Sequence, residues 1–182
     1  MKSAVFLDRD DTLIRNLPYL GDPSRVELMP RVHEGLALLA AEGLPLFVIS
    51  NQSGVGRGLI TREQVGLVNE AMEALLSGIA ISGYYMCYDA PGSAQGADER
   101  KPSPVMLQRA AEQYGLDLSK SVMLGDRLSD VQCGKNAGCA SLLVLGHSGE
   151  DDLVEARAQA DFVAEDFFQA AQWVVNRLKA SL

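Results

Sequence analysis

Near its start the chain reads Phe6-Leu7-Asp8-Arg9-Asp10-Asp11-Thr12-Leu13, and this stretch decides the fold because it places carboxylates directly after an apolar strand, residues 4–7. Open parallel α/β sheets bind their ligands at the carboxyl ends of their strands. Carboxylates this close repel one another unless a cation lies between them. A loop in which Asp11 or Thr12 only caps the next helix is the alternative. The stretch favours an α/β fold with a metal or phosphoryl site after its first strand.

Strand and helix patterns alternate along the whole sequence. Apolar runs predict strands at residues 4–7, 44–50, 84–88, 121–124, 141–145 and 161–164. Between them, apolar spacings of three and four predict helices, which begin near Val32, at the capping box Thr61-Arg62-Glu63-Gln64, at Ser103-Pro104, near Asp130 and near Phe167. This order predicts a three-layer, Rossmann-like α/β fold, in which helices cover both faces of a parallel sheet. We expect residues 1–182 to form one domain without a separate cap domain.

The composition excludes several classes of function. With 16 Lys and Arg against 24 Asp and Glu, the net charge of −8 argues against a nucleic-acid or anionic-membrane surface, both of which need a basic face. No apolar run approaches the roughly 20 residues of a membrane span, and the first strand leaves no room for a signal peptide. Three cysteines without a C-x-x-C pair are typical of a reducing compartment. We therefore expect a cytoplasmic monomer that binds neither nucleic acid nor membrane.

Three later segments place polar groups where a ligand could bind. Residues 50–58 read Ser-Asn-Gln-Ser-Gly-Val-Gly-Arg-Gly, which suits anion binding, although a plain turn uses the same residue types. Arg100 and Lys101 could neutralise anions, although such a pair is usually solvated. Asp126 follows the strand at residues 121–124, and Asp130 either joins it or starts a helix. Three acids from two strands would form an oxygen site suited to Mg²⁺.

Taken together and in this order, these segments resemble the motifs of the haloacid dehalogenase (HAD) superfamily of phosphohydrolases. The four motifs would be D-x-D-x-T at residues 8–12, the strand-end Ser50, Lys101, and G-D-x-x-x-D at residues 125–130. Phe-Leu-Asp-Arg-Asp, Asn51-Gln52-Ser53-Gly54 and Arg100-Lys101-Pro102 are similar to the branch that contains D,D-heptose 1,7-bisphosphate phosphatases and histidinol-phosphate phosphatases.

The resemblance implies a mechanism for this chain. Asp8 would attack phosphorus and form an aspartyl-phosphate, and Asp10 would serve as acid and then base. Ser50 and Lys101 would hold the phosphoryl oxygens. Mg²⁺ would be held by Asp8, the backbone carbonyl of Asp10, and Asp126. The residues expected on the substrate side are Tyr19, Asn51, Gln52, Ser53, Arg57, Arg100 and Arg127.

The sequence departs from this branch in the loop before Arg100. The branch commonly binds a structural zinc through C-x-H and C-x-C, but here Cys87 is followed by Asp89, and the last two cysteine positions hold Ala97 and Glu99. One thiol cannot build a tetrahedral zinc site, so we expect no structural zinc. Asp11, in place of the glycine usual in this branch, should not disturb the chemistry.

The resemblance makes the expected substrate a small phosphorylated metabolite, with the C7 phosphate of D-glycero-D-manno-heptose 1,7-bisphosphate as the leading candidate. Histidinol phosphate or a broad range of small metabolites is the alternative within the same class. A receiver-like signalling domain that stores a phosphoryl group on aspartate, or a non-catalytic paralogue, would be a different class of protein. The spacing of Asp8 and Asp10, for nucleophile plus acid/base, favours an enzyme.

Overall fold

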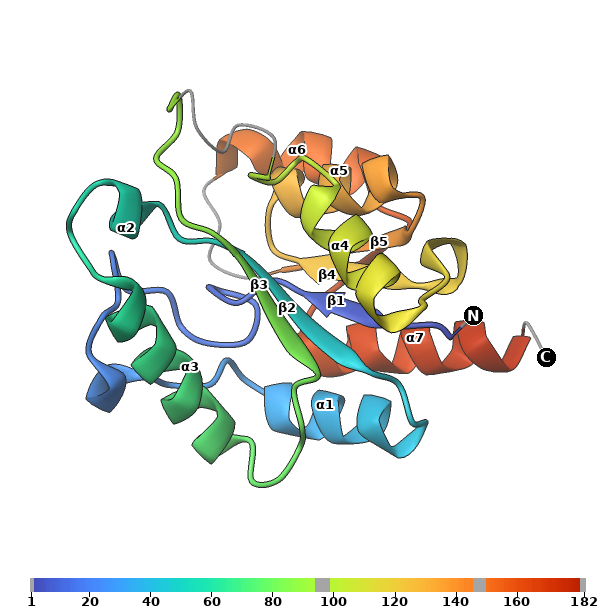
Figure 1. Ribbon diagram of the computed structural model, residues 1–182. Helices are drawn as coiled ribbons and strands as arrows, with labels where there is room; N and C mark the ends of the chain where they lie inside the picture. The colour runs from blue at the N-terminus through green and yellow to red at the C-terminus, as the bar shows by residue number, and fades with distance from the viewer. Residues whose placement is uncertain (1, 94–98, 146–149, 181–182) are drawn as a thin grey trace.

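The computed structural model describes residues 2–93, 99–145 and 150–180, and Figure 1 shows their arrangement. Six strands pair in parallel in one sheet, in the order β3-β2-β1-β4-β5-β6. The strands are β1 (Val5–Leu7), β2 (Leu46–Asn51), β3 (Gly83–Cys87), β4 (Val122–Gly125), β5 (Ala140–Val144) and β6 (Phe162–Ala164). The predicted parallel α/β sheet is confirmed.

The first strand lies in the middle of this sheet. β1 pairs with β2 on one side and β4 on the other, and Leu7 is in register with Val48 and Leu124. The strand order reverses beside β1, and such a reversal opens a crevice at the carboxyl ends of the strands. Asp8 and Asp126, which follow β1 and β4, are therefore delivered to one place.

Helices cover both faces of the sheet, as predicted (Figure 1). On one face, α1 (Val32–Ala41), α3 (Arg62–Leu75) and α7 (Phe167–Ala180) pack against alternate strand residues such as Val5 and Leu7. On the other face, Phe6 and its neighbours pack against α4 (Val105–Tyr114) and α5 (Leu128–Ala137), while Leu143 packs beside α6 (Glu150–Gln159). The period-two alternation of the strands thus supplies core residues to both faces of the sheet.

Several local predictions need correction. Residues 53–56, for which a plain turn was the alternative to an anion-binding segment, form a short helix, α2 (Ser53–Gly56). The helix α6 was not predicted. Pro104 is the N-cap of α4 and not its first residue, and α5 begins at Leu128, two residues before Asp130. The capping box at Thr61 is confirmed. The idea that Asp11 or Thr12 caps a helix is wrong, since the next helical elements are the 3-10 helix η1 (Pro23–Arg25) and then α1.

The remaining short element is a second 3-10 helix, η2 (Leu118–Lys120), which leads into β4. Within the described ranges, none of the helices combines the length and the apolar character that a bilayer crossing requires.

Candidate active site

The carboxyl ends of the central strands border a cavity of about 400 Å³. Of the residues predicted for the site, Arg57 is exposed and does not line this cavity, and Asp126 lies buried beside it. The predicted residues that do line it are Asp8, Asp10, Tyr19, Ser50, Asn51, Gln52, Ser53, Arg100, Lys101 and Arg127. The fold thus gathers most of the predicted site from four separate segments.

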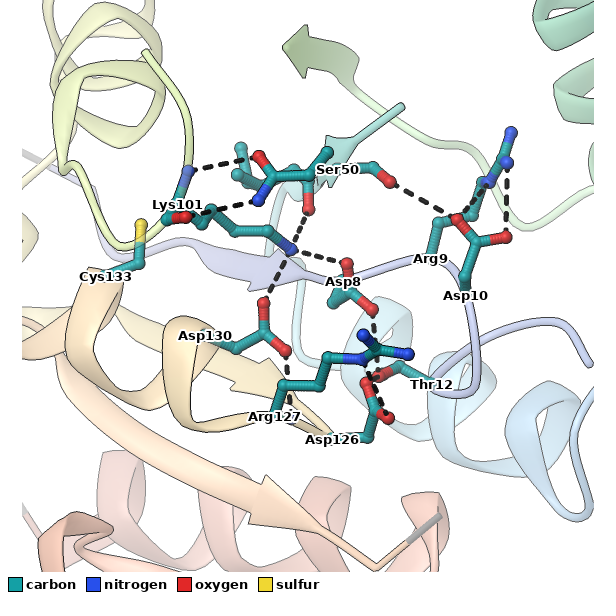
Figure 2. A network of polar contacts seen from close by, with 12 residues as sticks. Asp8, Arg9, Asp10, Thr12, Ser50, Lys101, Asp126, Arg127, Asp130 and Cys133 are labelled. Atoms are coloured by element: carbon teal, nitrogen blue, oxygen red, sulfur yellow. Dashed lines mark hydrogen bonds and ion pairs between the residues drawn. The ribbon is translucent and has the colours of Figure 1, made fainter. Parts of the chain in front are cut away.

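A buried lysine connects these segments (Figure 2). The Nζ atom of Lys101 lies 2.5 Å from Asp8 Oδ1 and 2.6 Å from Asp130 Oδ1, and it donates to the Ile49 carbonyl at 2.8 Å. Burial alone would lower the pKa of this ammonium group, but Asp130 and Asp8 outweigh burial and raise it. Lys101 is therefore a fixed cation at the base of the cavity, next to the carboxylate that follows β1.

Three buried carboxylates form a cluster beside the lysine. Asp8, Asp126 and Asp130 each offer an oxygen, and these oxygens lie within 4.8 Å of one another. Burial, together with repulsion from the other carboxylates, raises the pKa of Asp8 well above its usual range despite Lys101. Thr12 Oγ1 lies 3.4 Å from Asp8 Oδ2 and 3.5 Å from Asp126 Oδ1. Lys101 and Arg127, whose Nε lies 3.8 Å from Asp126 Oδ2, do not balance three carboxylates. The set of hard oxygen donors therefore fits a divalent cation such as Mg²⁺.

Asp130 has two structural roles. Its Oδ1 pairs with Lys101, and its Oδ2 accepts a hydrogen bond from the backbone N–H of Arg127 at 3.1 Å, in the first turn of α5. A Cβ atom on Gly125 would collide with the Asp130 side chain, so a glycine is required at the end of β4. Asp130 thus both starts the helix and holds Lys101, and its two oxygens are occupied by these contacts.

Asp126 makes the stability of the metal-free protein depend on pH. Burial, and then the charge of Asp130, raise the pKa of Asp126 to about 7, whereas the unfolded value is 3.8. Between these pH values the folded protein binds more protons than the unfolded chain, so the free energy of unfolding falls as the pH rises. The fall attributable to Asp126 is at most roughly 4 kcal/mol. Urea unfolding in EDTA at pH 5 and pH 8 covers about two of these pH units, so the wild type should show a fall of roughly 3 kcal/mol and Asp126→Asn a smaller one.

A matched control for this experiment is Asp152→Asn, which changes an exposed carboxylate on α6. This variant should keep the pH dependence of the wild type. Equal slopes in the wild type and Asp126→Asn would contradict the prediction.

Two residues predicted to contact substrate also hold other groups of the site. The side-chain amide of Asn51 donates to the Lys101 carbonyl at 3.2 Å and accepts from the Lys101 N–H at 3.1 Å, which clamps that backbone to the end of β2. Gln52 Nε2 donates to Asp10 Oδ2 at 2.7 Å and to Ser50 Oγ at 2.8 Å. Contact with substrate stays a prediction for both residues.

The carboxylate of Asp10 lies apart from the acidic cluster. It accepts a hydrogen bond from Gln52. It also faces the Ser50 hydroxyl, whose oxygen is 3.5 Å from Asp10 Oδ2, and it pairs with Arg9 (Figure 2). Only its backbone carbonyl was predicted to hold a metal, and that assignment stays a prediction. The sequence reasoning missed Arg9, which is 1% exposed; an arginine between two site aspartates was the signal available.

A larger cavity, of about 580 Å³, lies along the outer edge of β3 between α3 and α4. Tyrosines and charged side chains line it, among them Glu70, Tyr84 and Arg109, but none of the Asp8, Lys101 and Asp126 groups reaches it. Of these two cavities, the smaller one gathers Asp8, Asp10 and Lys101, so it is the better candidate active site.

The loop expected to lack zinc is only partly described. Cys87 is buried, and burial raises the pKa of its thiol. Ala97 lies outside the described residues. Among the residues that are described, the cluster of Asp8, Asp126 and Asp130 is the single His, Cys, Asp or Glu group with the geometry to hold a metal ion.

Comparisons with known proteins identify relatives. Residues 99–170 match the HAD-hydrolase-like family model. The chain is 34% identical to D-glycero-D-manno-heptose-1,7-bisphosphate 7-phosphatase of Chlorobaculum tepidum, over 93% of this chain and 94% of the relative. It is 32% identical to D-glycero-beta-D-manno-heptose-1,7-bisphosphate 7-phosphatase of Escherichia coli K12, over 97% and 95%. The crystal structure of D,D-heptose 1,7-bisphosphate phosphatase from B. bronchiseptica, complexed with magnesium and phosphate, superimposes with a TM-score of 0.83 at 26% identity, over 97% of this chain and 99% of that one.

Proposed function

Because the chain belongs to the heptose bisphosphate phosphatases of the HAD superfamily, we propose that it removes the C7 phosphate from D-glycero-D-manno-heptose 1,7-bisphosphate. It is a phosphoric monoester hydrolase, as the sequence predicted. The relatives named for this activity span nearly the whole chain, so the proposal concerns the complete site and not a shared fragment. The receiver-domain alternative has no counterpart among these relatives.

The observation that carries the proposal is the pairing of Asp8 with Lys101 at the base of a cavity that Arg100 and Arg127 also line. A nucleophile beside a fixed cation suits the phosphoryl group that reacts. Arginines elsewhere on the wall suit a second anion, because the planar guanidinium binds phosphate oxygens in pairs. A bisphosphate supplies both anions, which is why it is preferred over a substrate that carries an amine.

Each group has a definite role in the proposed reaction. A carboxylate oxygen of Asp8 attacks phosphorus, and the bond from phosphorus to the sugar oxygen breaks. Asp10 gives a proton to that oxygen, so the sugar leaves as an alcohol. Asp10 then takes a proton from water, which attacks the aspartyl-phosphate and releases inorganic phosphate and free Asp8. Ser50 and Lys101 hold the phosphoryl oxygens through both steps.

We assign the Mg²⁺ ligands to Asp8, the carbonyl of Asp10, and Asp126. Asp130 is left out because Lys101 and the Arg127 N–H already occupy its oxygens. When bound, Mg²⁺ would offset the repulsion between the Asp8 carboxylate and the incoming phosphate. The magnesium reported with the related crystal structure supports this assignment.

No structural zinc is expected, because the remaining thiol of the loop, Cys87, has no partners of the right type at the predicted positions. Elemental analysis of purified protein should find less than about 0.1 equivalent of zinc, and chelation should leave the unfolding temperature unchanged apart from the effect of removing Mg²⁺. One equivalent of tightly bound zinc would show that this expectation is wrong.

The test of function is phosphate release with Mg²⁺ from the α and β anomers of D-glycero-D-manno-heptose 1,7-bisphosphate and from histidinol phosphate. We expect one heptose anomer to exceed histidinol phosphate in kcat/KM by at least about 100-fold, since the second phosphate adds contacts that the amine cannot make. Similar, slow rates on all three would keep the phosphatase chemistry and reject the heptose assignment. No release from any of them would reject the proposed function.

A further inference from the structure

We propose that Arg9 is a positioning residue, whose guanidinium holds the Asp10 carboxylate in the orientation that proton transfer needs and is itself anchored by Asn69 of α3. This inference rests on the proposed function, because it assigns a cause to the placement of the acid and base. It concerns a residue that lies between the two aspartates of the first motif and outside the residues predicted for the site.

The contact between Arg9 and Asp10 involves both carboxylate oxygens. Arg9 Nε donates to Asp10 Oδ2 at 3.3 Å, and Nη2 donates to Oδ1 at 3.2 Å (Figure 2). Two parallel contacts from one planar group fix the rotation of a carboxylate as well as its position. A lysine at this place could offer only a point charge and would leave the rotation free.

Arg9 is held from its other side by a distant part of the chain. Nη1 donates to Asn69 Oδ1 at 2.9 Å, and Asn69 is supplied by α3, 60 residues further along the sequence. The guanidinium therefore bridges the loop after β1 and α3, a helix that packs on one face of the sheet. Because the helix is part of the packed layer, it gives the arginine a rigid support.

Gln52 completes the support of Asp10. Its amide donates to Asp10 Oδ2 at 2.7 Å, which orients that oxygen toward Ser50 and the cavity. The Asp10 side chain is 23% exposed, so without these contacts it could rotate into the cavity. Arg9 and Gln52 together restrict the Asp10 carboxylate to one orientation.

This arrangement suits the step assigned to Asp10. A group that first gives and later takes a proton must stay within hydrogen-bond reach of two different oxygens in turn. Displacement of such a group by about 1 Å can cost on the order of 100-fold in rate. If Arg9 only joined the loop to α3, its substitution would lower kcat by the same factor for every substrate and in every mutant background.

The experiment is a double-mutant cycle on kcat, with Arg9→Lys and Asp10→Asn alone and combined. In the otherwise wild-type enzyme, we expect Arg9→Lys to lower kcat on the preferred sugar phosphate by about 30-fold. In the Asp10→Asn background, the same change should lower kcat by no more than about 2-fold, because the group it positions is gone. Arg31→Lys, which changes an exposed arginine paired with Glu34 and Asp166, is the matched control and should leave kcat unchanged.

A second variant guards against a folding defect. Asn69→Ala keeps Arg9 and removes only its anchor, and it should lower kcat by about 5-fold in the wild type and leave kcat unchanged in Asp10→Asn. With p-nitrophenyl phosphate, whose leaving oxygen needs little protonation, Arg9→Lys should reduce the rate of the first-turnover burst by less than about 5-fold.

The outcomes separate the inference from the proposed function. Equal fold-losses for Arg9→Lys in both backgrounds, in variants that fold, would overturn the positioning role and leave the phosphatase assignment standing. If Arg9→Lys fails to fold, Asn69→Ala decides the test. Equal losses of kcat for Asn69→Ala in the wild-type and Asp10→Asn backgrounds would likewise overturn the positioning role. A wild type that hydrolyses none of the substrates would overturn the proposed function and the inference together.

Discussion

Asp8→Asn is expected to lower phosphate release by roughly four orders of magnitude or more, because it removes the nucleophile and leaves only binding and electrostatic groups. The amide has nearly the shape of the carboxylate, and the cavity keeps Lys101 and Ser50. The loss should appear in kcat, since the substrate still meets the same cations. It is measured by steady-state phosphate release and by the absence of a phosphoenzyme after acid quenching.

Stability separates this loss from misfolding. Burial and the neighbouring carboxylates raise the pKa of Asp8, so the ionised group is unfavourable in the metal-free folded state. Asp8→Asn should therefore unfold at a temperature no lower than that of the wild type. Asp11→Asn is the matched control, since it changes a buried aspartate three residues away whose left-handed backbone, with φ of 62°, asparagine also tolerates. Activity within about 5-fold of wild type in Asp8→Asn would exclude it as the nucleophile.

Lys101→Met is expected to remove both activity and stability. Without the ammonium group, Asp8 and Asp130 lose the cation that lies within 2.6 Å of each, and they stay buried beside Asp126. Breaking a buried ion pair from one side costs about 3–5 kcal/mol. Loss of the charge that holds the phosphoryl group should lower kcat/KM by about 1,000-fold. Urea unfolding in EDTA and phosphate release measure the two effects.

Lys135→Met is the control for this variant. Lys135 also pairs with an aspartate, Asp161, at 2.5 Å, but both side chains are more than a third exposed. Such a surface pair is worth about 0–1 kcal/mol, so the control should remain active and nearly as stable as the wild type. Equal destabilisation by the two lysine changes would show that the buried position of Lys101 is unimportant. Mg²⁺ should restore part of the stability of Lys101→Met, because a divalent cation can bind the released carboxylates.

The parts of the fold that were predicted correctly are those with a local cause. Short apolar runs and helical spacings identified the six strands and five of the helices that the structure describes, and the capping box at Thr61 located the start of α3. Asp8 and Asp126 were predicted to lie close together because each follows a strand of a parallel sheet. That prediction requires only that parallel strands end at the same edge of the sheet. Local sequence was therefore sufficient to predict those features of the fold that depend on a single strand or helix.

The errors arise where distant residues decide the structure. The hydrogen bonds between Asn51 and Lys101, and between Arg9 and Asn69, join residues 50 and 60 positions apart, so no local pattern announces them. Asp130 was open between helix start and site residue because its two oxygens serve both purposes. The polar helix α6 buries little and lacks a strong apolar stripe, which is why its sequence did not predict it.

The central position of β1 bears on how the molecule opens locally. β3 and β6 each have one pairing partner, whereas β1, β2 and β4 have two. Amide hydrogen exchange by sub-global opening begins at such edges, because fewer backbone hydrogen bonds must break there. An edge strand can thus open and close while β2, which contains Ser50, stays paired with β1, and β1 with β4, the strands that precede Asp8 and Asp126. We therefore expect Asp8, Ser50 and Asp126 to be attached to the part of the sheet whose amides exchange last.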